Sequence, residues 1–268
     1  MHWTKASQLF FAVTMIAIGL IGLVGGGFAP IWQPVPEAQV GRQILAYVCT
    51  FVSLATGAGL LVKRTAVPAA LLLFLYLFVW TAVFKFPFIV RAPLEEVSYQ
   101  SCGENLVLIA AAWVLYAEFA TSRSFPAGEV GLRVAYLLYG LALIAFGLSH
   151  FFYLQMTAPL IPSWLPAPVF WAYLTGTVYL ATGAAIVIGL APKLAAAAAA
   201  VQIALITLLV WGPMVLAGHL SPMHWQETIV SWALTAGAWV MATGSPPGKG
   251  LLRFPFPQDP SALSDRRR

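Results

Sequence analysis

Long uncharged apolar runs dominate the pattern of hydrophobic and polar positions in this chain. No Asp, Glu, Lys or Arg occurs within residues 6–36, 43–62, 65–84, 134–192, 194–226 and 228–248. Each run reaches or exceeds the ~20 residues that a helix needs to cross a hydrocarbon core of roughly 30 Å. Two of the runs are long enough for two elements each, or for a span and a long loop. The pattern predicts a polytopic membrane protein.

Charges, prolines and glycine clusters mark the expected ends of the membrane helices. We expect helices at residues 7–29, 43–62, 66–86, 101–120, 130–153, 167–190, 193–216 and 226–244. The first run could also be a signal peptide, but it is longer than a usual h-region of roughly 7 to 15 residues and more spans follow it. The predicted fold is therefore an all-α membrane bundle of eight transmembrane helices.

Composition supports this class of protein. Hydrophobic residues make up 60% of the 268 positions and charged residues 9%, and mean hydropathy is +0.85, whereas soluble domains carry about 25% charge. The net charge of +5 is small and concentrated in the tail that ends in Arg266, Arg267 and Arg268. Such a tail suits contact with anionic lipid headgroups, and the chain has too few basic residues for nucleic-acid binding.

The positions of Lys and Arg predict the orientation in the membrane. Eleven of the 14 lie at the termini or in the even-numbered connections, which leaves Arg42, Lys85 and Arg91 on the other side. By the positive-inside rule both termini are cytoplasmic, and this requires an even number of spans. We expect a multi-pass protein of a bacterial inner membrane in contact with the lipid bilayer.

The sequence also repeats itself. The segment ATGAGLLV at 55–62 matches ATGAAIVI at 181–188, and AAWVLYA at 111–117 matches GAWVMAT at 237–243, both displaced by 126 positions. The repeat predicts two tandem four-helix units, at 1–125 and 126–245, followed by a basic tail at 246–268. Because each unit has an even number of spans, the units share one orientation and are related by an axis along the membrane normal.

Motifs in the second unit carry a family resemblance. A span that ends in GLSHFF is followed by the loop IPSWLPAP and by the helix WAYLTGTVYLATGAAIVIG. An HF pair, a P-x-W-x-P loop and a W-x-x-x-(T/S)-G helix in this order resemble the DoxX-like membrane proteins. In the first unit the likeness is looser, and Gly25 aligns with His150.

This resemblance implies a membrane subunit more than an enzyme. The family takes its name from a small subunit of a thiosulfate:quinone oxidoreductase, and most members have no defined activity. We expect a protein that binds quinone or another lipophile and serves a redox system with other subunits, because no self-contained catalytic motif is present. The alternatives are a non-catalytic assembly or anchoring subunit and, third, a small-molecule transporter.

Two acids are expected at the outer mouths of corresponding helices. Only 13 uncharged residues, or about 20 Å of helix, separate Glu104 from Glu118. Glu104 lies 9 residues before Trp113 and Glu227 lies 12 residues before Trp239, an offset of about one helical turn. One interpretation of each acid is a first-turn carboxylate stabilised by the helix dipole. The other is a role in proton handling or ligand anchoring.

The histidines leave similar alternatives open. His150 is either an interfacial side chain bonded to a loop carbonyl, or a donor or acceptor for a hydroxyl or a quinone carbonyl. His219 and His224 are five residues apart and do not share a helix face, and no thiolate or acid completes a ligand set. We therefore predict no metal site.

The topology places many polar and aromatic residues on the outer side. The polar ones include His150, His219, His224, Lys85, Arg91, Glu95, Glu96, Cys102, Glu104 and Glu227; the aromatic ones are Phe151, Phe152, Tyr153, Trp164, Trp171 and Trp225. An interfacial belt explains most of the aromatic residues, although they would also suit a cleft for a flat quinone ring. The candidate ligand-binding residues are His150, Trp164, Glu227, Glu104, His219 and His224.

Overall fold

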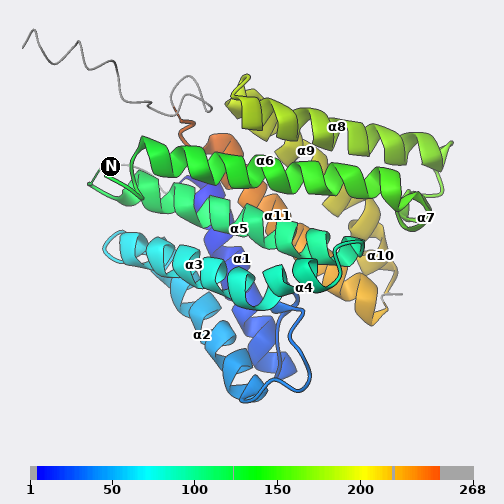
Figure 1. Ribbon diagram of the computed structural model, residues 1–268. Coiled ribbons are helices and arrows are strands. Elements are labelled where there is room, and N and C mark those ends of the chain that lie inside the picture. The colour runs from blue at the N-terminus through cyan, green and yellow to red at the C-terminus, as the bar shows by residue number, and fades with distance from the viewer. Residues whose placement is uncertain (1–4, 123, 219–220, 248–268) are drawn as a thin grey trace, which may run out of the picture.

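The chain folds into a bundle of long helices, shown in Figure 1. The computed structural model describes residues 5–122, 124–218 and 221–247, and these ranges contain no strand. The long helices are α1 (Ala6–Gly25), α2 (Arg42–Leu61), α3 (Ala66–Trp80), α5 (Glu96–Phe119), α6 (Glu129–Phe152), α8 (Pro168–Ile188), α9 (Pro192–Ile206) and α11 (Pro222–Thr243). The predicted all-helical class is confirmed.

Short elements extend or connect these helices. A π-helical segment, η2 (Thr81–Lys85), joins α3 to α4 (Phe86–Arg91), and a second one, η4 (Thr207–Trp211), joins α9 to α10 (Gly212–Ala217). The remaining short helices are η1 (Pro30–Trp32), α7 (Leu154–Thr157) and η3 (Ala158–Leu160). The third and seventh long helices therefore run without a break to Arg91 and Ala217.

Among the described residues, seven helices are long and apolar enough to cross a membrane. They include the continuous helices that run through η2 and η4. Helix α11 has 22 residues, which is sufficient length, but it is less apolar than the other seven. A multi-pass membrane bundle is thus the architecture, and the eighth span stays a prediction.

Several helices begin or end at other residues than expected, because a glycine turn or a capping side chain determines the end of the helix. Helix α1 stops at Gly25, four residues early, because Gly26 adopts a left-handed conformation with φ of 64°. Helix α11 starts at Pro222, four residues early, because the Ser221 side chain caps it by accepting a hydrogen bond from the His224 backbone N–H. Helix α5 starts at Glu96, five residues before the predicted position.

Helix packing follows the sequence repeat. The α1–α2 and α6–α8 pairs have the most extensive contacts, and α3–α5 is matched by α9–α11. Between the two sets, α5 packs on α6, α11 packs on α1, and α5 and α11 contact each other. Helix α5 is the most buried candidate span and lies among α3, α6 and α11 in the bundle of Figure 1.

Glycines bring both first helix pairs together in the same way. A Cβ built on Gly57 would lie 2.8 Å from the Ala12 carbonyl oxygen, and a Cβ on Gly183 would lie 2.7 Å from the Gly140 carbonyl oxygen. The helices of each pair therefore approach so closely that no side chain larger than glycine fits at either position. The contacts align residues 126 apart in α2 and α8 but 128 apart in α1 and α6.

This register corrects the counterpart of His150. A Cβ on Gly22 would lie 2.5 Å from Thr50 Oγ1, and a Cβ on Gly176 would lie 2.8 Å from the His150 Cβ. Thr50 and Gly176 are 126 positions apart, and Gly22 and His150 are 128 apart. Gly22, rather than Gly25, therefore occupies the position of His150, because equivalent residues are 128 positions apart in α1 and α6 and 126 positions apart in α2 and α8.

Candidate functional site

His150 lies in the last turn of α6 and faces α8. Its Nδ1 is 2.7 Å from the Phe146 carbonyl oxygen, one turn earlier in the same helix. Its ring centroid is 5.6 Å from that of Tyr179 on α8. The imidazole is thus held by a helix carbonyl, where the interfacial interpretation expected a loop carbonyl, and it rests against an aromatic ring.

Glu104 lies beside a buried lysine. The Lys85 side chain is 1% exposed, and its Nζ donates to the Ser101 carbonyl oxygen at 3.1 Å and to Asn105 Oδ1 at 2.9 Å. The Asn105 side chain in turn donates to Thr81 Oγ1 at 2.9 Å. Glu104, half-buried on the same turn of α5, attracts Lys85 electrostatically. Because α5 begins at Glu96, Glu104 lies beyond the first turn, where stabilisation by the helix dipole fades.

The other predicted residues have different surroundings. The His224 ring is half-buried with its centroid 6.2 Å from that of Trp211, and Glu227 is half-buried in the second turn of α11. Trp164 is 64% exposed in the connection between η3 and α8. His219 lies outside the described residues. The described candidates share one end of the bundle, but they belong to different helix pairs.

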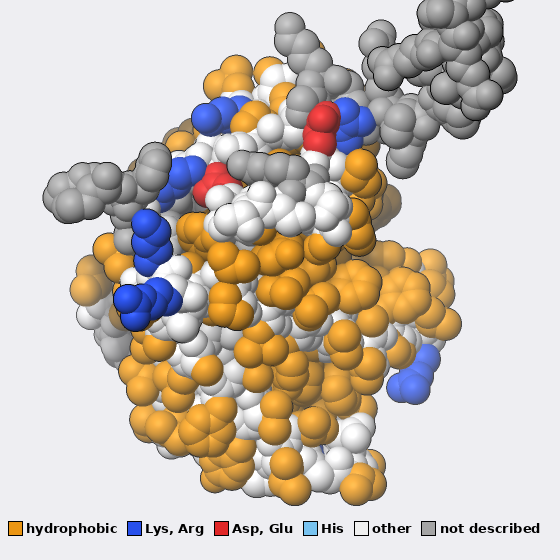
Figure 2. Space-filling model, turned by 90° about the vertical axis from the view of Figure 1, so that its left-hand side faces the viewer, with side chains coloured by type: hydrophobic (Ala, Val, Ile, Leu, Met, Phe, Trp, Pro, Cys, Tyr) orange, Lys and Arg blue, Asp and Glu red, His pale blue; other side chains and the backbone are white. Residues whose placement is uncertain are grey.

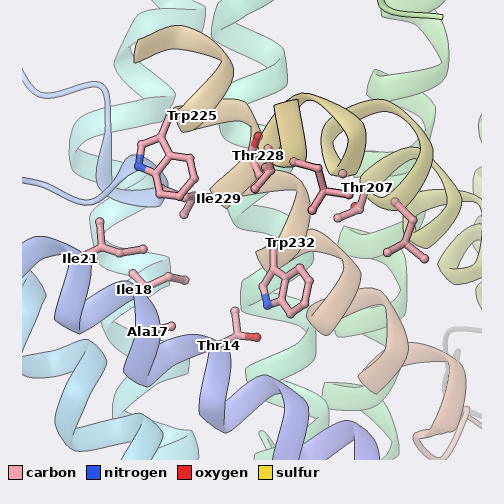
Figure 3. A pocket seen from close by; sticks show the side chains of 13 residues that line it. Thr14, Ala17, Ile18, Ile21, Thr207, Trp225, Thr228, Ile229 and Trp232 are labelled. Carbon is pink, nitrogen blue, oxygen red and sulfur yellow. The ribbon is translucent and has the colours of Figure 1, made fainter. Parts of the chain in front are cut away.

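An apolar groove lies elsewhere, between α1, α11 and the η4–α10 segment, as Figure 3 shows. Its volume is about 400 Å³, within the range of small-molecule sites. The residues that line it are Thr14, Ala17, Ile18, Ile21, Thr207, Leu208, Gly212, Val215, Leu216, Trp225, Thr228, Ile229 and Trp232. Among the described residues of this lining there is none of the candidates from sequence.

The sequence contains a helical spacing that corresponds to this groove. On α1 the lining residues are spaced i, i+3, i+4 and i+7 from Thr14, and on α11 they have the same spacing from Trp225. This spacing places each set on one helix face. Both helices are apolar on other faces too, so the sequence did not indicate which face lines a cavity.

The groove exists because the two units pack unequally at their junctions. The α5–α6 contact is more extensive than the equivalent α1–α11 contact. At the α5–α6 junction the Phe146 ring packs on Gly103, within 3.1 Å of where a Cβ would be. The equivalent of Phe146 in α1 is Ile18, and the equivalent of Gly103 in α11 is Ile229. Two aliphatic side chains thus line a groove where an aromatic ring on a glycine closes the other junction.

The three hydroxyl groups in the lining differ in their hydrogen bonds, and that of Thr228 donates to the His224 carbonyl oxygen at 2.7 Å. Thr207 Oγ1 lies 2.9 Å from the Ile203 carbonyl, 2.7 Å from Ser231 Oγ and 2.8 Å from Thr235 Oγ1. Thr14 is 2% exposed, and its Oγ1 has no hydrogen-bond partner among the described residues. The surface of the groove is therefore apolar, and the unsatisfied Thr14 hydroxyl is buried in its wall.

Comparisons with protein-family models, curated proteins and solved structures give no match for this chain.

Proposed function

We propose that this chain is a membrane protein with eight spans, arranged as two tandem four-helix units, that binds a lipophilic molecule in the groove between α1 and α11. The groove itself carries the proposal. It is apolar and open, and its lining residues belong to helices that would lie in the bilayer. Because a lipophilic ligand is about as stable in the surrounding lipid as in an apolar groove, contacts with the lining residues must retain it there.

Lateral access from the bilayer supports a lipophile over a water-soluble ligand. Leu216 is 90% exposed, and Leu208, Trp225 and Trp232 are also exposed along the groove. In a spanning bundle these side chains face hydrocarbon, so a molecule dissolved in the membrane reaches the groove without crossing an aqueous phase.

Quinone is the lipophile that we propose first. The indole rings of Trp225 and Trp232 are on one side of the groove (Figure 3) and would suit a flat ring. The DoxX-like motifs around His150 point to the same chemistry by resemblance. In this proposal the chain serves as a quinone-binding membrane subunit, and a partner carries any further redox centre.

The orientation with cytoplasmic termini belongs to the same proposal. Figure 2 views the left-hand end of the bundle in Figure 1, and Lys and Arg side chains gather around it. The described basic residues of this end are Lys5, Lys63, Arg64, Arg133 and Lys193. Their position supports a cytoplasmic location of this end by the positive-inside rule.

Ligand extraction tests the proposal. The protein would be purified in detergent and extracted with organic solvent, and the extract analysed by mass spectrometry for quinones and other lipids. Gly212→Phe is the blocking variant: a Cβ there meets only the Thr207 carbonyl oxygen, at 3.9 Å, and the residue 126 positions earlier is Phe86. Leu75→Phe, on the exposed face of α3, is the matched control.

We expect one lipophile to be enriched with the wild type and with Leu75→Phe, and to fall at least tenfold with Gly212→Phe. His150→Ala and Glu227→Ala compare the sequence-based candidates with the groove, and we expect both to retain the ligand. Equal extracts from wild type and Gly212→Phe would refute the proposal. Stable isolation with another protein and without a lipophile would favour the assembly role.

A further inference from the structure

The unsatisfied hydroxyl of Thr14 narrows the class of ligand. Thr14 lines the groove from α1, and Figure 3 shows its side chain below the indole of Trp232. Its Oγ1 forms no hydrogen bond among the described residues. A buried hydroxyl without a partner is destabilising, so such a group calls for an explanation.

Most other helical threonines among the described residues avoid that state, although Thr50 on α2 also forms no side-chain hydrogen bond. A threonine in a helix ordinarily donates to the carbonyl oxygen four residues earlier. Distances of 2.6–2.9 Å to this carbonyl are found for Thr56, Thr81, Thr175, Thr177, Thr182, Thr207, Thr228, Thr235 and Thr243. Thr14 departs from this behaviour, and it does so in the wall of the groove.

The depth of Thr14 excludes an ordinary phospholipid as its partner. Thr14 is the ninth residue of the 20-residue helix α1, about 12 Å from its start at 1.5 Å per residue. In a hydrocarbon core of roughly 30 Å this lies near the middle. Phospholipid headgroups and ester carbonyls stay near the interface, and acyl chains have no hydrogen-bonding atoms at that depth.

We propose that the ligand is a neutral lipophile with a carbonyl or hydroxyl oxygen, which hydrogen-bonds to Thr14 Oγ1 near the middle of the membrane. This inference rests on the proposed function of the groove and adds the chemical class of its occupant. The hydroxyl is shielded in the ligand-free structure, so a lining side chain must shift when the ligand binds. Trp232, which lies beside Thr14 and is exposed, is the side chain that we assign to this movement.

The equivalent site in the other unit lacks this feature. The residue of α6 that corresponds to Thr14 is Ala142, which is fully buried. Its methyl group offers no hydrogen bond, and the α5–α6 junction around it is closed by Phe146. The ligand site is therefore single, at the α1–α11 junction.

Two probes of matched size separate hydrogen bonding from apolar contact. Wild-type protein in lipid nanodiscs would be titrated with a decyl-substituted benzoquinone and with dodecylbenzene, which has no oxygen. The variants are Thr14→Val, which keeps the shape but removes the hydroxyl, Thr14→Ser, which keeps the hydroxyl, and Gly212→Phe. Infrared spectra of the bound, carbonyl-labelled quinone report hydrogen bonding directly.

We expect Thr14→Val to weaken quinone binding about three- to tenfold, the effect of one hydrogen bond, and to shift the carbonyl band to higher frequency. Dodecylbenzene binding should not change, and Thr14→Ser should behave as wild type. Without ligand, Thr14→Val should be at least as thermally stable as wild type, because it removes an unsatisfied group.

The outcomes distinguish this inference from the function on which it rests. Loss of both probes in Gly212→Phe, with quinone affinity and carbonyl band unchanged in Thr14→Val, would leave the groove function intact and overturn the hydrogen bond. Equal weakening of both probes in Thr14→Val would indicate a packing role and would also overturn it. Failure of the wild type to bind either probe would overturn both proposals.

Discussion

At the scale of single residues, the two units exchange a small and a large side chain at one contact. In the first unit Gly22 on α1 meets Thr50 on α2, and in the second His150 on α6 meets Gly176 on α8. The glycine is on the first helix of the pair in one unit and on the second helix in the other, and the helices are close in both. His150 therefore has a packing requirement, because its place depends on the glycine opposite.

Substitution of Gly176 tests this requirement. In Gly176→Thr the new Cβ would lie 2.8 Å from the His150 Cβ and 2.9 Å from the Phe151 ring. We expect a loss of about 1–3 kcal/mol, as for other overpacked sites, and partial recovery in His150→Gly with Gly176→Thr, which installs the pair of the first unit. Thermal unfolding in detergent measures both.

The control is Gly25→Ala. Among the described residues nothing lies within 4 Å of a Cβ at Gly25, so its unfolding temperature should stay close to that of wild type. If the double variant is no more stable than Gly176→Thr alone, the close contact between positions 150 and 176 does not determine the stability of the bundle.

At this scale the sequence predicted at which end of the bundle the polar residues lie, but it did not predict the side chains that surround them. Lys85 was expected among the polar groups of the outer side, but its partner Asn105 was not singled out, because an uncharged amide looks ordinary within an apolar run. Thr14 was missed for the same reason. A hydroxyl in a helix is unremarkable until its missing hydrogen bond is seen in three dimensions.

At the scale of elements, the third and seventh long helices share an irregular turn. The π-helical segments η2 and η4 begin at Thr81 and Thr207, which are 126 positions apart, and Pro87 and Pro213 follow them. A proline cannot donate to the carbonyl four residues earlier, and a wider turn accommodates this loss. Each threonine also bonds across to the last helix of its unit, to Asn105 or Ser231. The prolines were visible in the sequence, whereas the width of the turns was not.

A double-mutant cycle on Lys85 and Asn105 tests how η2 is fixed to α5. Lys85→Met would leave Asn105 Oδ1 and the Ser101 carbonyl without their donor, and Asn105→Leu would remove an acceptor from a buried ammonium group. Removal of one partner of a buried charged group is costly. We expect the double variant to be more stable than the sum of the single effects predicts, by about 0.5–3 kcal/mol.

Reversible unfolding of the purified protein measures the cycle, and Ser231→Ala provides the comparison at the equivalent, uncharged contact of the second unit. Its cost should be smaller than that of Lys85→Met, because Trp211 occupies the position of the lysine there and carries no charge. Additive single effects of Lys85→Met and Asn105→Leu would show that the two side chains stabilise the bundle independently.

At the scale of the whole molecule, hydrogen bonds at one end of the bundle connect the two units. The groove lies at the α1–α11 junction. Glu118 at the end of α5 accepts from Lys5 Nζ at 2.9 Å and from the Ser245 backbone N–H at 3.0 Å. Thr243 Oγ1 donates to Ser7 Oγ at 2.7 Å. These bonds connect the start of α1, the end of α5 and the residues after α11. The α1–α11 pair is thus fixed at one end, while the groove opens between the halves of these helices nearer the other end.

The sequence repeat anticipated this arrangement only in part. Matching segments 126 positions apart predicted equivalent helices, and the equivalent helix pairs within the two units have contacts of similar extent. The groove depends on the inequality between Ile18 and Phe146, which belong to the first helices of the two units. The 126-position repeat does not align Ile18 with Phe146, because equivalent residues of α1 and α6 are 128 positions apart and only the helix contacts show this. The single open junction could therefore not be predicted from the sequence.

The number of spans and their direction give the last prediction. Cysteine variants at exposed positions in a background with Cys49→Ala and Cys102→Ala would be treated with a membrane-impermeant maleimide in intact cells. We expect labelling of Ala38→Cys, Ser163→Cys and Ser221→Cys, since all three lie in connections at the end of the bundle that we propose to be the outer one. Lys63→Cys and Ser245→Cys should react only after permeabilisation. Ser245 is suitable because its bond to Glu118 uses the backbone N–H, which the substitution retains.

The decisive comparison is between Ser221→Cys and Ser245→Cys, which flank α11. This helix is less apolar than the other long helices, but its α5 and α9 contacts require it to lie within the bundle. Neighbours at bilayer depth can shelter its polar residues, so a lower hydropathy is compatible with a span. Opposite labelling of the two positions would establish the eighth span and the even number that the basic residues demand. The same labelling at both would place α11 on one side and remove the α11 wall of the groove from the membrane.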